Sequence, residues 1–444
     1  MKQTISTEEF QLAKHALAFA VSHGAIKARV TLSKTVMNLF GIRDGALDKV
    51  TQSLDRSLSF NLFVDGRYGT YSINRLEKAT LEKFILNAVE TTRMLAPDPA
   101  RDLPDISRTA NGAVDGLDLY DPAVEDLDSE ARLAMALKSA PVIADNPDYK
   151  LVSVEGEYSD SVSDTLILDS NSLECRSSES SFETGYEVTV EAPDGSKFSG
   201  YWWDSSPKLG GLDLEGCAYK ALERAVAQIG PQKAESARTN VVVDTECASK
   251  LFSPLLSALG GYAQQQRNSF LLDSLGKEIL GTNVSIVDKP LEKGRNGARR
   301  FDSEGVATSE ADIIRDGVIR RYFVNTFIAN KTGLAPTIED ASRPVLIPCG
   351  GLKTKEELIR KAGNGILVTG FNGGNCNSST GDFSYGVDGF LFRDGKIVHP
   401  VREILMTGNL VKLWRNLIAT ADDARSCLSR QVPSLAFANV DISA

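Results

Sequence analysis

Residues 373–390 read GGNCNSSTGDFSYGVDGF and bring glycines, amides, hydroxyls and a carboxylate together in one short stretch. Amide and hydroxyl groups can donate and accept hydrogen bonds, and glycine lets a ligand approach the backbone closely. The stretch therefore predicts a binding site for a peptide or a carbohydrate, with five candidate side chains: Asn375, Asn377, Thr380, Asp382 and Ser384. A second interpretation is a tight turn between strands, in which Asn and Asp bond nearby backbone groups. The two interpretations are compatible, and both stay open at this point.

Few residues of the chain could act as catalysts. The three histidines are His15, His23 and His399, and a three-histidine zinc site would need all of them although they lie far apart in the sequence. The sequence has no H-E-x-x-H pair, G-x-S-x-G elbow, P-loop or dinucleotide-binding glycine pattern. A hydrolase that uses Asp382, Ser384 and His399 is a further hypothesis, but these residues lack the arrangement of an established general base. We therefore expect no catalytic residue in this chain.

Composition and charge narrow the class of protein. The chain has 444 residues, 42% of them hydrophobic and 24% charged, which is typical of a soluble protein with two or three domains. It has no apolar run near the roughly 18 residues that a membrane helix needs. Its first residues, MKQTISTEEF, lack the apolar core of a secretory signal. We therefore expect a cytoplasmic protein that makes no membrane contact.

The charge also bears on possible partners. A net charge of -10 opposes binding to phosphate backbones, so we expect no direct contact with nucleic acid. The densest basic run, residues 293–300, is interpreted as a solvated loop rich in Gly and Asn. The six cysteines are too scattered for a metal knuckle and too few for a disulfide scaffold, which favours reduced thiols.

The predicted elements give an α+β class, because strands come in runs and do not alternate regularly with helices. A capping box at Ser6 and Glu9 opens a first helix, and Asp65-Gly66 predicts a hairpin between strands at 58–64 and 68–73. A helix is expected at 80–95, before the proline-rich segment APDPARDLPD. An antiparallel meander follows, with strands expected at 150–158, 161–169, 182–192 and 197–203.

These elements predict three domains. Residues 1–105 form an N-terminal helix and hairpin domain, residues 106–232 a β-rich middle domain, and residues 233–444 a mixed, β-rich C-terminal domain. Within the third domain, leucines 251, 255, 256 and 259 predict an amphipathic helix that ends at Gly260-Gly261.

Three runs in the C-terminal half also carry a family resemblance. Residues 365–410, GILVTGFNGGNCNSSTGDFSYGVDGFLFRDGKIVHPVREILMTGNL, resemble the signature of the TldD/PmbA family, specifically its PmbA (TldE) branch. The runs NSFLLDSLGKEIL at 268–280 and FVNTFIANKTG at 323–333 resemble the same branch, and weaker similarity extends over nearly the whole chain. Members of this family have also been labelled modulators of DNA gyrase, a role for which this acidic chain offers no direct DNA contact.

The resemblance implies a function and also a departure from it. The TldD branch is a metallopeptidase whose H-E-x-x-x-H motif supplies two histidine ligands and a glutamate base. Here the motif should fall within residues 252–258, which read FSPLLSA. The resemblance therefore implies a chain without metal ligands, paired with a zinc-bearing, TldD-like homologue in a complex that degrades or trims small unfolded peptides. A homodimer is the other expected assembly, and a stand-alone homodimeric regulator that binds peptide or protein without proteolysis is the alternative function.

Overall fold

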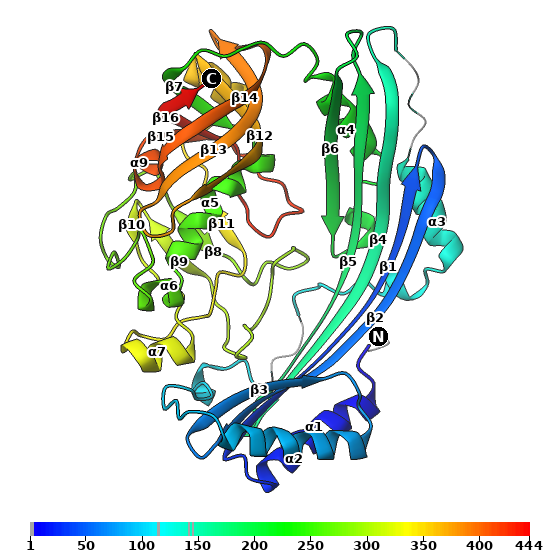
Figure 1. The fold of residues 1–444 in the computed structure, drawn as a ribbon, viewed down its shortest axis with the longest axis vertical. Coiled ribbons are helices and arrows are strands. Elements are labelled where there is room, and N and C mark those ends of the chain that lie inside the picture. Colours follow the sequence, from blue (N-terminus) through cyan, green and yellow to red (C-terminus); the bar gives the residue numbers. More distant parts are fainter. Residues whose placement is uncertain (1–3, 113–115, 141–142, 144–145) are drawn as a thin grey trace.

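The computed structural model describes residues 4–112, 116–140, 143 and 146–444. Figure 1 shows long curved strands from the first half of the chain on one side and the more compact C-terminal half on the other. The helices are α1 (Thr7–Ser22), α2 (Lys78–Arg93), α3 (Ser129–Ser139), α4 (Gly216–Val226), α5 (Thr245–Ala258), α6 (Gly261–Gln265), α7 (Thr326–Thr332), α8 (Lys355–Ala362) and α9 (Leu410–Arg415). Short 3-10 helices lie at Ile106–Arg108, Pro122–Glu125 and Leu209–Gly211.

The strands complete a mixed α+β architecture, which confirms the predicted class. They are β1 (Lys27–Arg43), β2 (Ala46–Val64), β3 (Arg67–Ile73), β4 (Lys150–Asp169), β5 (Glu174–Glu191), β6 (Lys197–Ser206), β7 (Ala237–Val243), β8 (Ile286–Asp288), β9 (Ala311–Arg315), β10 (Val318–Ile319), β11 (Pro344–Leu346), β12 (Gly365–Cys376), β13 (Asp382–Arg393), β14 (Lys396–Asn409), β15 (Leu417–Thr420) and β16 (Leu435–Ser443). In the part of the chain that the structure describes, no helix is both long and apolar enough to cross a membrane.

The first half of the chain forms one antiparallel sheet in the order β3-β2-β1-β4-β5-β6. The capping box at Ser6 and Glu9 starts α1 as predicted. Asp65 and Gly66 have φ angles of 51° and 73° and close the predicted hairpin between β2 and β3, because a two-residue hairpin turn needs positive φ at both positions.

The long strand β4 corrects the sequence prediction. Two strands with a break at 159–160 were expected from the Ser-Asp pair, but β4 runs through both positions. Asp160 is tolerated there because Arg132 from α3 donates to its carboxylate at 2.6 Å and Asn38 from β1 donates at 3.0 Å. A buried carboxylate with a charged partner can occupy a strand interior, which polarity alone does not reveal.

The same strand pairs with β1, which lies on the other side of the predicted boundary at residue 105. β1 pairs with β4 over nearly all its length, from Arg29 opposite Asp169 to Arg43 opposite Glu155. The predicted segments 1–105 and 106–232 therefore share one sheet. Helices cover one face of it: α1 and α2 pack on one end and α3 and α4 on the other (Figure 1).

The C-terminal half contains a second six-stranded sheet, in the order β14-β13-β12-β7-β16-β15. β14 also pairs with β16, so five of these strands close into a ring. α5 packs against this ring through Leu251, Phe252 and Leu255, which are fully buried. It ends at Ala258, as the leucine spacing and the Gly260-Gly261 pair predict. The ring and α5 together place the stretch 373–390 beside the helix.

Candidate functional site

The stretch 373–390 forms the β12–β13 hairpin, whose turn is fixed by local hydrogen bonds. The Asn377 side-chain oxygen accepts from the backbone N–H groups of Ser379 at 2.9 Å and Thr380 at 3.2 Å. Gly381 has a φ of 77° and donates to the Asn377 carbonyl. The Asn377 side chain therefore acts as the turn interpretation expects.

Two further candidates hold the turn against the neighbouring strand. The Thr380 hydroxyl accepts from the Asp382 backbone N–H at 3.2 Å. The Asp382 carboxylate accepts from the Asn409 side-chain amide at 2.9 Å, and this bond holds the pKa of Asp382 below its usual value. Asn409 also donates to the Thr380 carbonyl at 2.8 Å. Thr380 and Asp382 thus tie the hairpin end to the start of α9.

A cavity of about 990 Å³ lies between this hairpin and the helices α5 and α6. Of the five candidate side chains, Asn375 lines it. Ser384 lies directly opposite Asn375 across the β12–β13 ladder and is exposed to solvent. The other lining residues are mostly aromatic, small or hydroxyl-bearing: Cys247, Ser249, Lys250, Ser253, Pro254, Ser257, Ala258, Gly260, Tyr262, Ala263, Gln266, Asn268, Phe270, Phe371, Gly374, Cys376, Ser378 and Tyr385.

One wall of the cavity is a free strand edge. β7 pairs with β12 only from Gly365 to Val368, whereas β13 pairs with the other side of β12 as far as Cys376. From Gly370 onward, β13 is therefore the only strand among the described residues that pairs with β12, and the other edge of β12 has no strand partner. Phe371, Gly374, Asn375 and Cys376 of this part of β12 line the cavity. This edge offers backbone N–H and C=O groups to a ligand.

The opposite wall is α5, which contains a proline in its interior. Asp244 caps the helix by accepting from the Glu246 N–H at 3.1 Å. Pro254 has no backbone N–H, so the carbonyl of Lys250, four residues earlier, lacks its usual helical donor. Both residues line the cavity. The Lys250 carbonyl is therefore a backbone acceptor that lacks its helical donor and belongs to a residue lining the cavity.

Comparisons with known proteins agree on one family. Residues 28–92 match PmbA/TldA metallopeptidase domain 1, residues 116–229 the PmbA/TldA metallopeptidase central domain, and residues 236–444 the PmbA/TldA metallopeptidase C-terminal domain. The chain belongs to the PmbA/TldD family. It is 28% identical over 418 residues to Metalloprotease PmbA of Escherichia coli O157:H7, and the match covers 94% of this chain and 92% of that protein.

Solved structures give the same result. A proposed modulator of DNA gyrase from Bacteroides thetaiotaomicron VPI-5482 is 40% identical, with a TM-score of 0.95 and 99% of each chain covered. TldE from Thermococcus kodakarensis has a TM-score of 0.84 over 98% of this chain and all of its own, at 16% identity, and so shares the fold.

The sequence resemblance places the H-E-x-x-x-H motif of the TldD branch within residues 252–258, in the α5 wall of the cavity. With the motif at residues 253–258, its two histidines and glutamate would fall at Ser253, Ala258 and Pro254, which all line the cavity. The register one residue earlier would place the first histidine at Phe252, which is fully buried in the core. Neither register contains histidine or glutamate. Across the described ranges, no three His, Cys, Asp or Glu side chains cluster closely enough to hold a metal ion.

The histidines of this PmbA/TldD chain lie apart. The His15 ring lies 2.8 Å from Glu82 on α2, and His23 caps the end of α1. His399 on β14 is opposite Leu391, whereas Ser384 is opposite Thr407, eight positions away. At a rise of about 3.3 Å per residue, that separation is roughly 26 Å. The structure therefore does not bring Ser384 and His399 together, which contradicts the hydrolase hypothesis.

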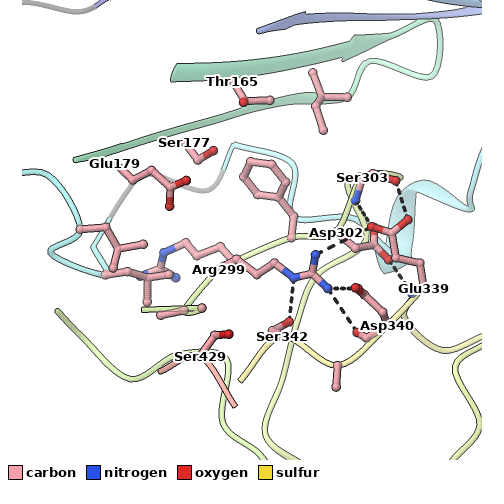
Figure 2. Close-up of a pocket in the computed structure, with 18 of the residues that line it drawn as sticks. Thr165, Ser177, Glu179, Arg299, Asp302, Ser303, Glu339, Asp340, Ser342 and Ser429 are labelled. Carbon is pink, nitrogen blue, oxygen red and sulfur yellow. Dashed lines mark hydrogen bonds and ion pairs between the residues drawn. The ribbon is translucent and has the colours of Figure 1, made fainter. Parts of the chain in front are cut away.

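A second cavity, of about 490 Å³, lies between the first sheet and loops of the C-terminal half (Figure 2). Arg299 crosses it and donates to the Ser342 hydroxyl at 2.8 Å and to the Asp340 carboxylate. Ser303 donates its N–H to Glu339 at 2.7 Å. Arg299 and Ala298 belong to the basic run 293–300, and Ala298 is buried. The predicted solvated loop is thus partly enclosed here.

Sequence reasoning missed most of the cavity. Phe371 lies two residues before the stretch 373–390, and Lys250 and Pro254 lie more than a hundred residues earlier. Asn268 and Phe270 belong to the run 268–280, which was identified only by its resemblance to the family. The sequence offered one signal of the α5 wall, a proline inside an amphipathic helical pattern. Such a proline leaves the carbonyl four residues earlier without its helical donor.

Proposed function

We propose that this chain is the metal-free, non-catalytic, TldE/PmbA-like subunit of a cytoplasmic TldD–TldE-type metallopeptidase complex. The complex degrades or trims small unfolded peptides, and zinc is bound by the TldD-like partner. The observation that carries the proposal is the 990 Å³ cavity between α5, at the position of the absent motif, and the free edge of β12.

The cavity fits a peptide in extended conformation. A strand added to β12 beyond Gly370 would form main-chain hydrogen bonds with the open edge, as in β-strand addition. Its alternate side chains would point toward the rings of Phe371, Tyr385 and Phe270. Main-chain recognition is tolerant of sequence, which suits a complex that acts on unfolded peptides.

Catalysis is assigned to the partner for a chemical reason. Some relatives of this chain are named metalloproteases, and that name describes those proteins. In this chain the motif positions are occupied by Ser253, Pro254 and Ala258, and neither proline nor alanine can bind zinc or accept a proton from metal-bound water. We therefore propose that this chain shapes and lines the peptide site while the partner supplies the metal.

The test is peptide cleavage by the pure chain with added zinc, alone and after mixing with a TldD-type homologue from the same organism. We expect no cleavage alone and cleavage on mixing. Ser257→Trp, which projects a large ring into the cavity from an exposed helix position, should lower the cleavage by the mixed complex at least tenfold while leaving assembly intact. Ser129→Trp, on the exposed start of α3, is the matched control and should cleave normally.

Two results would change this proposal. Cleavage by the pure chain would show that it carries a catalyst. A stable homodimer that binds peptide and ignores the TldD-type chain would favour the stand-alone regulator.

A further inference from the structure

The cavity beside β12 differs in charge from the protein as a whole. The whole chain has a net charge of -10, yet among the described residues that line the cavity only Lys250 carries a formal charge. An anionic ligand is repelled by the field of the whole molecule, but within this cavity it would meet a cation and no carboxylate.

Lys250 is oriented toward the cavity by an aromatic ring. Its Nζ atom lies 5.1 Å from the centre of the Tyr385 ring. Tyr385 is 2% exposed and lines the cavity, where the edge of Phe371 packs on it with ring centres 5.4 Å apart. The cation–π contact places the ammonium group beside the cavity and leaves its N–H donors for a ligand.

The carboxylates nearest to Lys250 in the sequence and along the hairpin are engaged elsewhere. Glu246, one turn earlier on α5, accepts from Arg425 at 2.7 and 2.8 Å. Asp382 accepts from Asn409. Within the described ranges Lys250 itself forms no ion pair.

We propose that Lys250 makes the cavity selective for peptides that carry a carboxylate, either at the C-terminus or on an Asp or Glu side chain. The inference rests on the proposed peptide-binding function. A peptide strand on the free edge of β12 runs between that edge and α5, so a carboxylate on the side that faces α5 lies within reach of the ammonium group. The charge-assisted hydrogen bond between them adds to main-chain binding that is otherwise independent of sequence.

The test is fluorescence anisotropy with the full-length chain and four labelled, unstructured peptides of equal length. One is neutral with an amidated C-terminus, one is neutral with a free C-terminal carboxylate, one is amidated and contains Glu, and one is amidated and contains Lys. The two carboxylate peptides should bind roughly three- to tenfold more tightly than the neutral amidated peptide, because a partly exposed charged hydrogen bond contributes about that much. The Lys peptide should bind most weakly, and added salt should reduce the differences.

Lys250→Gln should remove the difference in affinity between the carboxylate peptides and the neutral amidated peptide, and Lys250→Glu should reverse it. Lys331→Gln is a matched control, because Lys331 is also exposed and lies 5.1 Å from an aromatic ring, that of Phe327, outside the cavity. It should keep the preference. Equal affinities for all four peptides, or a preference that survives Lys250→Gln, would overturn this inference and leave peptide binding standing. Failure of every peptide to bind would overturn the inference and the proposed peptide site together.

Discussion

At the scale of single residues, the sequence shows which side chains are polar but not whether they point into the cavity or bond the turn. Asn375 lines the cavity as the binding interpretation expects, whereas Asn377, Thr380 and Asp382 bond the turn and its neighbouring strand. Both interpretations were open because Asn, Asp and Thr satisfy local backbone groups as readily as they bind ligands. Lys250 gave no sequence signal at all, since one lysine on a helix face is ordinary.

Asp302 should make the free energy of unfolding depend on pH. Its side chain is 2% exposed, and burial, together with the nearby Glu339 and Glu304 carboxylates, raises its pKa to about 6. The unfolded value is about 3.9, so the folded chain binds more protons than the unfolded chain between these values. The contribution of Asp302 to the free energy of unfolding should therefore be largest at low pH and fall as pH rises through about 6.

Asp302→Asn removes this titration. We expect the difference in unfolding free energy, wild type minus variant, to fall by up to roughly 3 kcal/mol between about pH 4 and about pH 7, as a shift of about two pKa units requires. Urea denaturation at several pH values measures it. Parallel pH profiles for the two proteins would show that Asp302 does not titrate in this window.

At the scale of elements, helices and turns were predicted better than strands. The capping box, the Asp65-Gly66 hairpin and the helix before Gly260 were confirmed because their signals are local. The length of β4 was missed because Asp160 is stabilised by Arg132, a partner from another element. The free edge of β12 was also beyond the sequence, since it arises where β7 ends and α5 turns away.

Pro254 allows a test of the α5 wall. Pro254→Ala restores a backbone N–H for the Lys250 carbonyl, so we expect the chain to gain roughly 1 to 3 kcal/mol in unfolding free energy. Peptide binding should weaken, because the carbonyl is no longer available to a ligand. Denaturant unfolding and peptide titration measure the two effects. Ser249→Ala, which changes a neighbouring lining side chain and no backbone group, should leave stability nearly unchanged; a variant Pro254→Ala that binds peptide as wild type does would rule out the carbonyl as a contact.

At the scale of the whole molecule, the two halves of the chain are joined by buried contacts that no sequence pattern predicted. Arg425, in the loop between β15 and β16, donates to Glu246 on α5 and to the carbonyl of Trp203 on β6. Its guanidinium group also lies 4.2 Å from the centre of the Trp202 ring. The order of the predicted strands and helices was enough to predict the α+β class, but not the single sheet shared by residues 1–105 and 106–232 or this junction.

Arg425→Met tests the junction. It leaves Glu246, whose side chain is 13% exposed, without this cation, which costs roughly 3 to 5 kcal/mol, and we expect lower stability with separate unfolding of the two halves in calorimetry. Adding Glu246→Gln should recover part of the loss, because the uncompensated charge is removed. Arg43→Met breaks an exposed ion pair with Glu155 and should change stability by less than about 1 kcal/mol. A similar loss in both variants would show that the junction has no special role.

The proposed function requires that the cavity beside β12 holds an extended peptide. Hydrogen exchange of the full-length chain, read by mass spectrometry with and without a saturating unstructured peptide, tests it most directly. We predict slower exchange at the backbone amides of residues 370–376 and in α5, because an added strand bonds the open edge of β12. Unchanged exchange at residues 370–376 while the peptide is bound would contradict this claim.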